Sequence, residues 1–267
     1  MSITTIDGAL AGMQQPREFV KAVTGAMVAG RPHSLFYLAG IPGAAVAPTP
    51  GIGGEVLTSY LGQLPWSNPV SGNSYLARLQ GQATIAGTLL LCDRLWHNSG
   101  ISPTVITEQV FTASAQIPAR DANGSNAGTG VYAGFEVSGV MGAGTPTITL
   151  KYTNQAAVAD KTATNINAVV AASIAGTFYP IGLASGDTGI QKAQSVTLSA
   201  TMTSGTIHCV LYRVLARLEL QAQIGNAIDC LTGGFVRLYD NTVPFLIFIP
   251  NTTTTSNISG HAIWSQG

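Results

Sequence analysis

Charged side chains are scarce in this sequence. Aspartate, glutamate, lysine and arginine make up 9% of its 267 residues, whereas an ordinary soluble domain has about 25%. Twelve positive and twelve negative residues cancel, so the formal net charge is zero. Nucleic-acid binding needs clustered basic residues that neutralise phosphates, and the four lysines, Lys21, Lys151, Lys161 and Lys192, are scattered. We therefore expect no nucleic-acid partner.

A disulfide framework and a membrane-spanning segment are also missing. The three cysteines, Cys92, Cys209 and Cys230, are odd in number and lack the spacing of a stapled secreted domain. The first ten residues have neither the basic nor the apolar region of a signal peptide. Apolar runs such as residues 244–250 are too short for a membrane helix. These absences predict synthesis in a reducing cytoplasm and no membrane partner.

Small and hydroxylated residues take the place of the missing charge. Hydrophobic residues make up an ordinary 46% of the chain, so a core can form. A monomer usually stays soluble through charge and mutual repulsion. A surface without them suits a protein packed against copies of itself or a partner. The composition therefore favours a structural assembly component over an enzyme, and we expect no catalytic, cofactor or metal site.

Alternation of apolar and polar residues predicts a mainly β fold beyond residue 100. Residues 131–138 and 147–153 alternate around a glycine-rich turn at 139–144, which predicts a half-buried hairpin. Residues 196–202 and 207–215 flank a turn at 203–206, and the second segment is apolar on both faces, as in a central strand. Further strands are predicted at 235–239, 245–249 and 258–264. Such spacing predicts an antiparallel β-sandwich or jelly-roll-like domain.

Residues 83–97 fit a buried strand and a short helix about equally well. The surrounding β pattern favours the strand. The segment 123–128, rich in asparagine and glycine, is predicted to be an exposed loop.

The N-terminal part of the chain has a different character. Phe19, Val23 and Met27 form a stripe after Pro16, which predicts a helix over residues 16–29. Residues 34–74 are rich in proline and glycine and predict an extended arm. The sequence thus suggests an N-terminal helix and arm at 1–72, followed by a β-sandwich domain at 73–267.

The predicted arm contains aromatic residues, which a flexible linker would lack. Phe36, Tyr37, Tyr60 and Trp66 are the candidate interface residues, in contact with a neighbouring subunit. The alternative is that they cover the sandwich of their own chain. The sequence does not separate these two interpretations.

Asp187, Thr188 and Gly189 form the tripeptide found in aspartic proteases. Such enzymes need two carboxylates that share a proton, and Asp and Gly in this setting are more simply turn residues. We favour the turn. His208 and Cys209 are adjacent and would point to opposite faces of a strand, and the other histidines and cysteines lack zinc-ligand spacing.

Three tryptophans, Trp66, Trp96 and Trp264, could form a platform on which sugar rings stack. Tryptophans are more often core or interface anchors. Core or interface positions are therefore the favoured interpretation.

Several stretches resemble virion structural proteins of tailed bacteriophages. These stretches are residues 89–101, 148–156, 186–198, 237–255 and 265–267. The resemblance extends along nearly the whole chain, but its motifs are strands and turns, so no functional residue is transferred by it. It implies a head decoration (cement) protein that is made in the host bacterial cytoplasm and lies on the head surface of the virion.

The same resemblance implies two partners. One is the major capsid protein, and the other is the chain itself, as a homo-oligomer for which a trimer at capsid threefold positions is expected. The alternative is a tail, baseplate or fibre-associated β protein that binds a host receptor glycan.

Overall fold

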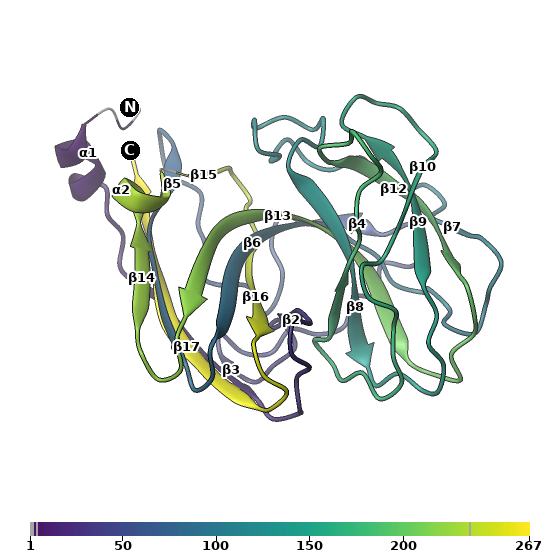
Figure 1. Ribbon diagram of the computed structural model, residues 1–267. Helices are drawn as coiled ribbons and strands as arrows, with labels where there is room; N and C mark the ends of the chain where they lie inside the picture. The colour runs from purple at the N-terminus through teal and green to yellow at the C-terminus, as the bar shows by residue number, and fades with distance from the viewer. Residues whose placement is uncertain (1–2, 4, 235) are drawn as a thin grey trace.

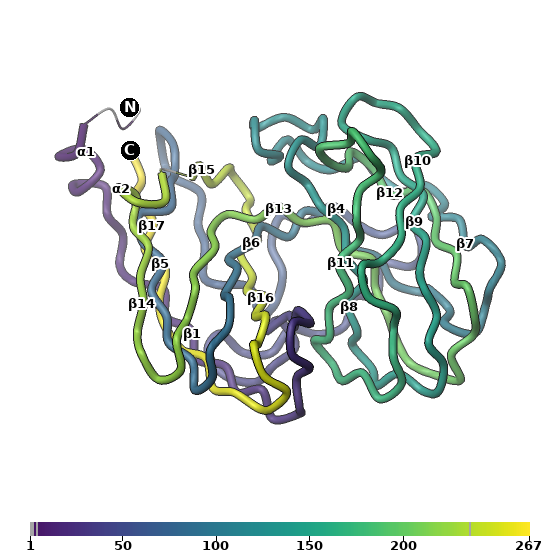
Figure 2. The backbone as a smooth tube through the Cα atoms, viewed as in Figure 1, coloured from purple at the N-terminus to yellow at the C-terminus, as the bar shows by residue number. Residues whose placement is uncertain are grey.

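A computed structural model describes residues 3, 5–234 and 236–267. It shows a mainly antiparallel β protein in which two sandwiches lie side by side and share one long sheet (Figures 1 and 2). A short helix lies near the N-terminus. The predicted fold class is a mainly β, antiparallel sandwich or jelly-roll-like fold with an N-terminal helix and an extended arm; a mainly antiparallel β-sandwich fold with a helix near the N-terminus is confirmed.

The shared sheet has seven strands. Its order is β11 (Phe178–Pro180), β8 (Val131–Gly139), β13 (Thr206–Leu220), β6 (Gly87–His97), β16 (Pro244–Pro250) and β2 (His33–Ser34), and β4 (Glu55–Val56) also pairs with β6. The long strands β13 and β6 run from one sandwich into the other (Figure 1). They form the bridge between the two halves of the molecule.

A six-stranded sheet packs against one end of the bridge. Its order is β14 (Asn226–Asp229), β5 (Ser74–Ala83), β17 (Ser256–Gln266), β1 (Arg17–Val23) and β3 (Gly40–Ile41), and β15 (Arg237–Leu238) also pairs with β5. Phe19, Leu89, Leu218, Phe248 and Trp264 lie in the core between the two sheets.

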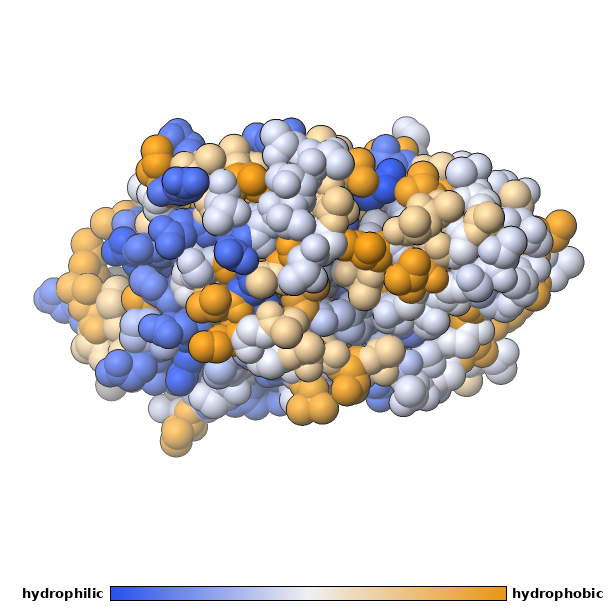
Figure 3. Space-filling model, turned by 90° about the horizontal axis from the view of Figure 1, so that it is seen from below, coloured by the Kyte–Doolittle hydropathy of each residue, from blue (hydrophilic) through white to orange (hydrophobic). Residues whose placement is uncertain are grey.

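A four-stranded sheet packs against the other end. Its order is β10 (Lys161–Thr164), β9 (Ile148–Asn154), β12 (Ile190–Leu198) and β7 (Gln109–Val110). Phe135, Tyr152, Val196 and Leu211 lie in this second core. In Figure 3 much of this half has a surface of intermediate hydropathy with little strongly hydrophilic colour.

Alternation along β6 places both cores on the same face of the bridge. Leu91 lies in the first core and Leu95 in the second, whereas Cys92 belongs to a third cluster on the opposite face. Two register shifts, between Leu211 and Tyr212 and between Val214 and Ala216, interrupt the pairing of β13 with β6. Bulges of this kind bend a sheet, and here they lie between the two sandwiches.

Strands from residues 1–72 pair with strands from residues 73–267. β1 pairs with β17, β2 with β16, and β4 with β6. The segment 33–64 also supplies side chains to the third cluster, on the outer face of the bridge. A division of the chain at residue 72 stays a prediction.

The helix predicted over 16–29 is wrong. Residues Arg17–Val23 form β1, with burial that alternates along the strand, and α1 lies earlier, at Ile6–Ala11. Phe19, Val23 and Met27 follow one another at intervals of four residues. Such a spacing keeps residues on one face of a helix, which has a period of 3.6 residues, and also on one face of a strand, which has a period of 2. The residue that would have shown period 2 is Lys21, which is charged and yet buried.

Both predicted hairpins are also wrong in their pairing, although the strands themselves exist. β8 pairs with β13 and β11, whereas β9 pairs with β10 and β12. β12 and β13 likewise belong to different sheets. The turns at 139–144 and 203–206 therefore lead the chain from one layer of the sandwich to the other, and β13 is a central strand, as predicted.

Other strand predictions are confirmed. β16 and β17 include residues 245–249 and 258–264, and residues 83–97 form the end of β5, a turn and β6. In the predicted strand 235–239, Arg237–Leu238 form β15, and Phe235 lies outside the described residues. A second short helix, α2 (Cys230–Gly233), follows β14.

Candidate functional site

Three of the four candidate interface residues lie together on the outer face of the bridge. Phe36 is 1% exposed and stacks on Tyr60, with ring centroids 5.7 Å apart. Tyr37 meets the edge of Phe36 at 5.8 Å. Within one chain these residues cover their own sheet. Contact with another subunit stays a proposal for the partly exposed edges of Tyr37 and Tyr60.

Trp66 lies apart from this cluster. Its ring meets Trp264 edge-on, with centroids 5.7 Å apart, beside the first core. The indole nitrogen donates a hydrogen bond to Asn68 Oδ1. Trp66 is therefore part of the packing around the end of β17.

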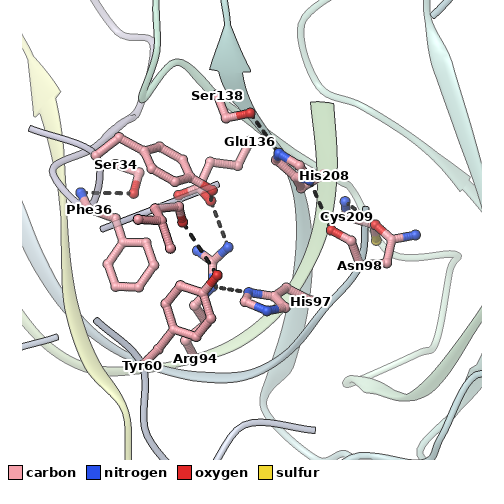
Figure 4. A network of polar contacts seen from close by, with 12 residues as sticks. Ser34, Phe36, Tyr60, Arg94, His97, Asn98, Glu136, Ser138, His208 and Cys209 are labelled. Atoms are coloured by element: carbon pink, nitrogen blue, oxygen red, sulfur yellow. Dashed lines mark hydrogen bonds and ion pairs between the residues drawn. The ribbon is translucent and has the colours of Figure 1, made fainter. Parts of the chain in front are cut away.

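A buried ion pair lies under the aromatic cluster (Figure 4). Arg94 Nη2 of β6 is 2.7 Å from Glu136 Oε2 of β8, and neither side chain is exposed. Tyr37 donates a hydrogen bond of 2.9 Å to the same carboxylate. The Arg94 guanidinium lies 4.6 Å from the ring centroid of Phe36, a cation–π contact.

The charge of Glu136 is stabilised by these neighbours. Burial alone would raise its pKa, but Arg94 and the hydrogen bonds from Ser34 and Tyr37 outweigh burial and lower it. The carboxylate is therefore ionised, and it ties the segment 33–37 to β6 and β8 of the bridge.

Two histidines extend this network. His97 Nδ1 accepts a hydrogen bond from Arg94 Nε at 3.1 Å, and its Nε2 lies 2.9 Å from Glu55 Oε1. Burial, with Arg94 and His208 nearby, lowers the pKa of His97 to about 2. The ring is thus neutral, with the proton on Nε2 donated to Glu55. This bond holds β4 against the bridge.

His208 of β13 connects β8 with Asn98, the residue that follows β6. Its Nε2 lies 2.7 Å from Ser138 Oγ, and its Nδ1 lies 2.9 Å from the carbonyl oxygen of Asn98. Burial lowers the pKa of His208 as well. The ring therefore accepts from one partner and donates to the other.

A second buried network occupies the opposite face of the bridge, between the two cores. Asp93 Oδ2 lies 3.1 Å from Arg120 Nε, and Asp93 Oδ1 accepts from the backbone N–H of Val243 at 2.9 Å. Arg120 also donates to the carbonyl oxygens of Leu57 and Asn241. Burial raises the pKa of Asp93, against the opposing effect of Arg120 and Arg213.

The two networks follow from adjacent residues of one strand. Asp93 and Arg94 point to opposite faces of β6, so one position fastens the covering segment and the other fastens loops of both sandwiches. We name the two networks together the bridge networks (Asp93, Arg94, Arg120, Glu136 and Arg213). Their arrangement pairs Arg94 with Glu136 and Arg120 with Asp93, and it joins segments that are distant in sequence.

Sequence reasoning did not find the bridge networks. Glu136 alternates with apolar residues, a pattern that is typical of a solvent-facing position, and only the segment 33–64 folding over it buries it. A detectable signal was the presence of two adjacent charged residues, Asp93 and Arg94, inside an apolar run. Charged residues are almost never fully buried unless each has a partner of opposite charge, so these two residues predict partners elsewhere in the chain.

Asp187 lies in a turn, as favoured. Its carboxylate accepts hydrogen bonds of 2.7 Å from Tyr152 Oη and from Asn154 Nδ2. These two bonds lower its pKa. The residue thereby fixes the loop before β12 to β9.

The remaining chemical candidates do not come together. His208 and Cys209 point to opposite faces, and in the described part of the chain no group of three or more histidine, cysteine or acidic residues could hold a metal ion. Trp96 and Trp264 are buried, so the three tryptophans form no common exposed platform.

Within the described ranges, no helix is both long and apolar enough to cross a membrane. No model of a known protein family matches the sequence, and no curated protein matches it.

Solved structures show faint likenesses. One is the structure of infectious bursal disease virus Gt strain, with 11% identity, a TM-score of 0.19, and coverage of 95% of this chain and 82% of that chain. Another is the crystal structure of the infectious bursal disease virus VP2 subviral particle, with 8% identity, a TM-score of 0.20, and coverage of 96% and 82%. Both come from viral particles.

Proposed function

We propose that this chain is a non-enzymatic structural component of a virion, and specifically a decoration (cement) protein on the head of a tailed bacteriophage. Its partners are further copies of itself and the major capsid protein. The resemblance of its strand and turn segments to phage virion proteins supports the class of protein.

The scarcity of charge supports a structural role most directly: the chain has few charged side chains, and a part of them lies inside the molecule. Seven of the 24 charged side chains are buried. They are Lys21, Asp93, Arg94, Arg120, Asp121, Glu136 and Arg213. The other 17 charged side chains are those left to the surface, so the surface stays poor in charge, and such a surface is easily desolvated against a protein lattice.

The bridge networks support the same role from inside. They fix the covering segment and both sandwiches with charge-assisted hydrogen bonds, which are stronger than neutral ones. A rigid, preformed subunit loses little conformational entropy when it binds. Many modest contacts on a shell then add up through multivalency.

Cryo-electron microscopy of the virion that contains this chain tests the proposal. Density at repeated symmetry positions of the head lattice is the expected result. In a second test, purified chain is added to expanded heads that lack it, and we expect binding and a higher rupture temperature. Density confined to the tail or its tip, or binding to cell-surface glycans without affinity for heads, would replace decoration with receptor binding.

A further inference from the structure

A groove with many polar side chains lies between the two sandwiches. Its volume is about 370 Å³, which falls within the range of small-molecule sites, about 300–1,000 Å³. Thr58 and three short segments line it, and these segments are residues 72–74, 118–120 and 237–241. We name this surface the polar groove (Thr58 and these three segments). Its lining comes from parts of the chain that are distant in sequence, so only the folded protein forms it.

Arg120 fixes one wall of the polar groove. This residue is 3% exposed, and its guanidinium pairs with Asp93. It also donates to the carbonyl oxygens of Leu57 and Asn241. These bonds hold the segment 118–120 against the bridge before any ligand binds. A preformed site loses little conformational entropy on binding.

One buried hydroxyl in the polar groove has no hydrogen-bond partner. Ser74, the first residue of β5, is 1% exposed, and within the described part of the chain its Oγ makes no hydrogen bond. Buried polar side chains nearly always have a partner, so an unpartnered one needs an explanation. Because Ser74 lines the groove, a ligand bound there can supply the partner that the protein does not.

Two charged side chains of the polar groove also have free bonding capacity. Among the residues that the structure describes, neither Arg237 nor Asp240 forms an ion pair. The Arg237 guanidinium lies 4.9 Å from the ring centroid of Tyr239 and donates to Asn73 Oδ1. These contacts position it, and it has further N–H groups to donate. The carboxylate of Asp240 supplies acceptors only.

These groups indicate the chemical class of the ligand. Arg237 repels a cation and Asp240 repels an anion, so a ligand with a net charge is opposed by one of them. An uncharged ligand that donates and accepts at several positions satisfies Arg237, Asp240 and Ser74 together. Sugars have this property, because each hydroxyl is one donor and two acceptors.

We propose that the polar groove binds an uncharged saccharide of one or two units. Asp240 accepts hydrogen bonds from its hydroxyl groups, Arg237 donates to them, and the hydroxyl of Ser74 pairs with one of them. Pro118 and Ala119, which also line the groove, offer an apolar surface to the C–H groups of the sugar ring. This binding adds a ligand to the proposed structural role and does not depend on that role.

Saturation-transfer NMR of the full chain tests the site with free sugars. The uncharged probes are glucose, galactose, mannose, N-acetylglucosamine and maltose. Sialic acid, glucosamine and the zwitterion glycine are the charged probes. We expect transfer to at least one uncharged sugar and none to the charged probes. No transfer to any uncharged sugar, or equal or stronger transfer to a charged probe, would overturn the proposal.

Ser74→Ala separates a binding role from a structural one. Removal of an unpartnered buried hydroxyl should leave Tm unchanged or raise it, whereas Kd for the sugar should rise about five-fold. Asp240→Ala should raise Kd about ten-fold, because hydrogen bonds to charged groups are stronger. Glu18→Ala, at an exposed position of β1, is the matched control and should leave Kd unchanged. Unchanged Kd values for both groove variants would contradict the assignment of the site.

A bulky side chain in the polar groove should block it without removing a polar group. Ala119 is exposed and lines the groove, so Ala119→Trp should abolish sugar binding. Ala227→Trp, at an exposed position of β14, should leave it intact, and full binding by Ala119→Trp would contradict the proposal. Head binding is measured on the same proteins. A wild type that binds heads but no sugar removes the site alone, and one that binds sugar but no heads removes the decoration role alone.

Discussion

At the level of single residues, the ion pair between Arg94 and Glu136 should be the most sensitive position in the molecule. Arg94→Met leaves a buried carboxylate unpaired and is expected to lower the free energy of unfolding by about 3–5 kcal/mol. The double variant Arg94→Met with Glu136→Leu removes both charges and should lose less than about 2 kcal/mol. Urea unfolding of the two variants measures the difference, and equal losses would show that the pairing of charges is not what matters there.

The buried histidines should make the fold sensitive to acid. Burial, with Arg31 nearby, lowers the pKa of His33 from 6.5 to about 4. Between these values the unfolded chain binds a proton that the folded chain does not, so the free energy of unfolding falls as the pH drops below 6.5. The loss from His33 is about 3 kcal/mol by pH 4, and His97 and His208 act in the same direction.

The slope of stability against pH isolates this effect. Unfolding is followed between pH 7 and pH 4 for wild type, His33→Asn and the comparison variant His261→Asn. The slope should become shallower for His33→Asn only. An unchanged slope would mean that His33 does not remain neutral in the folded protein.

At the level of elements, β4 depends on close contact between a glycine and the bridge. Gly54 has φ +69°, and a Cβ there would lie 2.2 Å from Trp96 Cζ2 and 2.6 Å from the carbonyl oxygen of His97. Gly54→Ala should therefore cost about 3 kcal/mol, from the clash and the left-handed backbone together. Gly30 has φ +71° with open space around it, so Gly30→Ala should cost only about 1 kcal/mol. Thermal unfolding compares the two, and similar losses would rule out the clash as the cause.

The sequence predicted the positions of the strands better than it predicted which strands pair with each other. Alternation is a local signal, so β8, β9, β13, β16 and β17 were predictable where residues alternate or are apolar on both faces. Which strands pair depends on distant segments, and the turns at 139–144 and 203–206 look the same whether they close a hairpin or cross between layers. The burial of charged residues was not predictable for a related reason. Only the tertiary fold covers Glu136 and Lys21, and both residues look like surface positions in the sequence.

At the level of the whole molecule, the two sandwiches should unfold together. β13 and β6 contribute to both cores, and the network around Asp93 and Arg120 joins loops from both halves. Neither sandwich can lose its share of the bridge without exposing the core of the other. Calorimetry should therefore show one transition whose calorimetric and van't Hoff enthalpies agree. Two resolved transitions would show that the bridge does not couple the halves.

The order of strands in the six-stranded sheet bears on synthesis at the ribosome. β17, the last strand of the chain, lies between β5 and β1 and pairs with both of them. β1 and β5 are thus translated long before the strand that separates them. This sheet can close only after residues 256–266 have left the exit tunnel, and until then the apolar inner faces of β1 and β5 are available to chaperones.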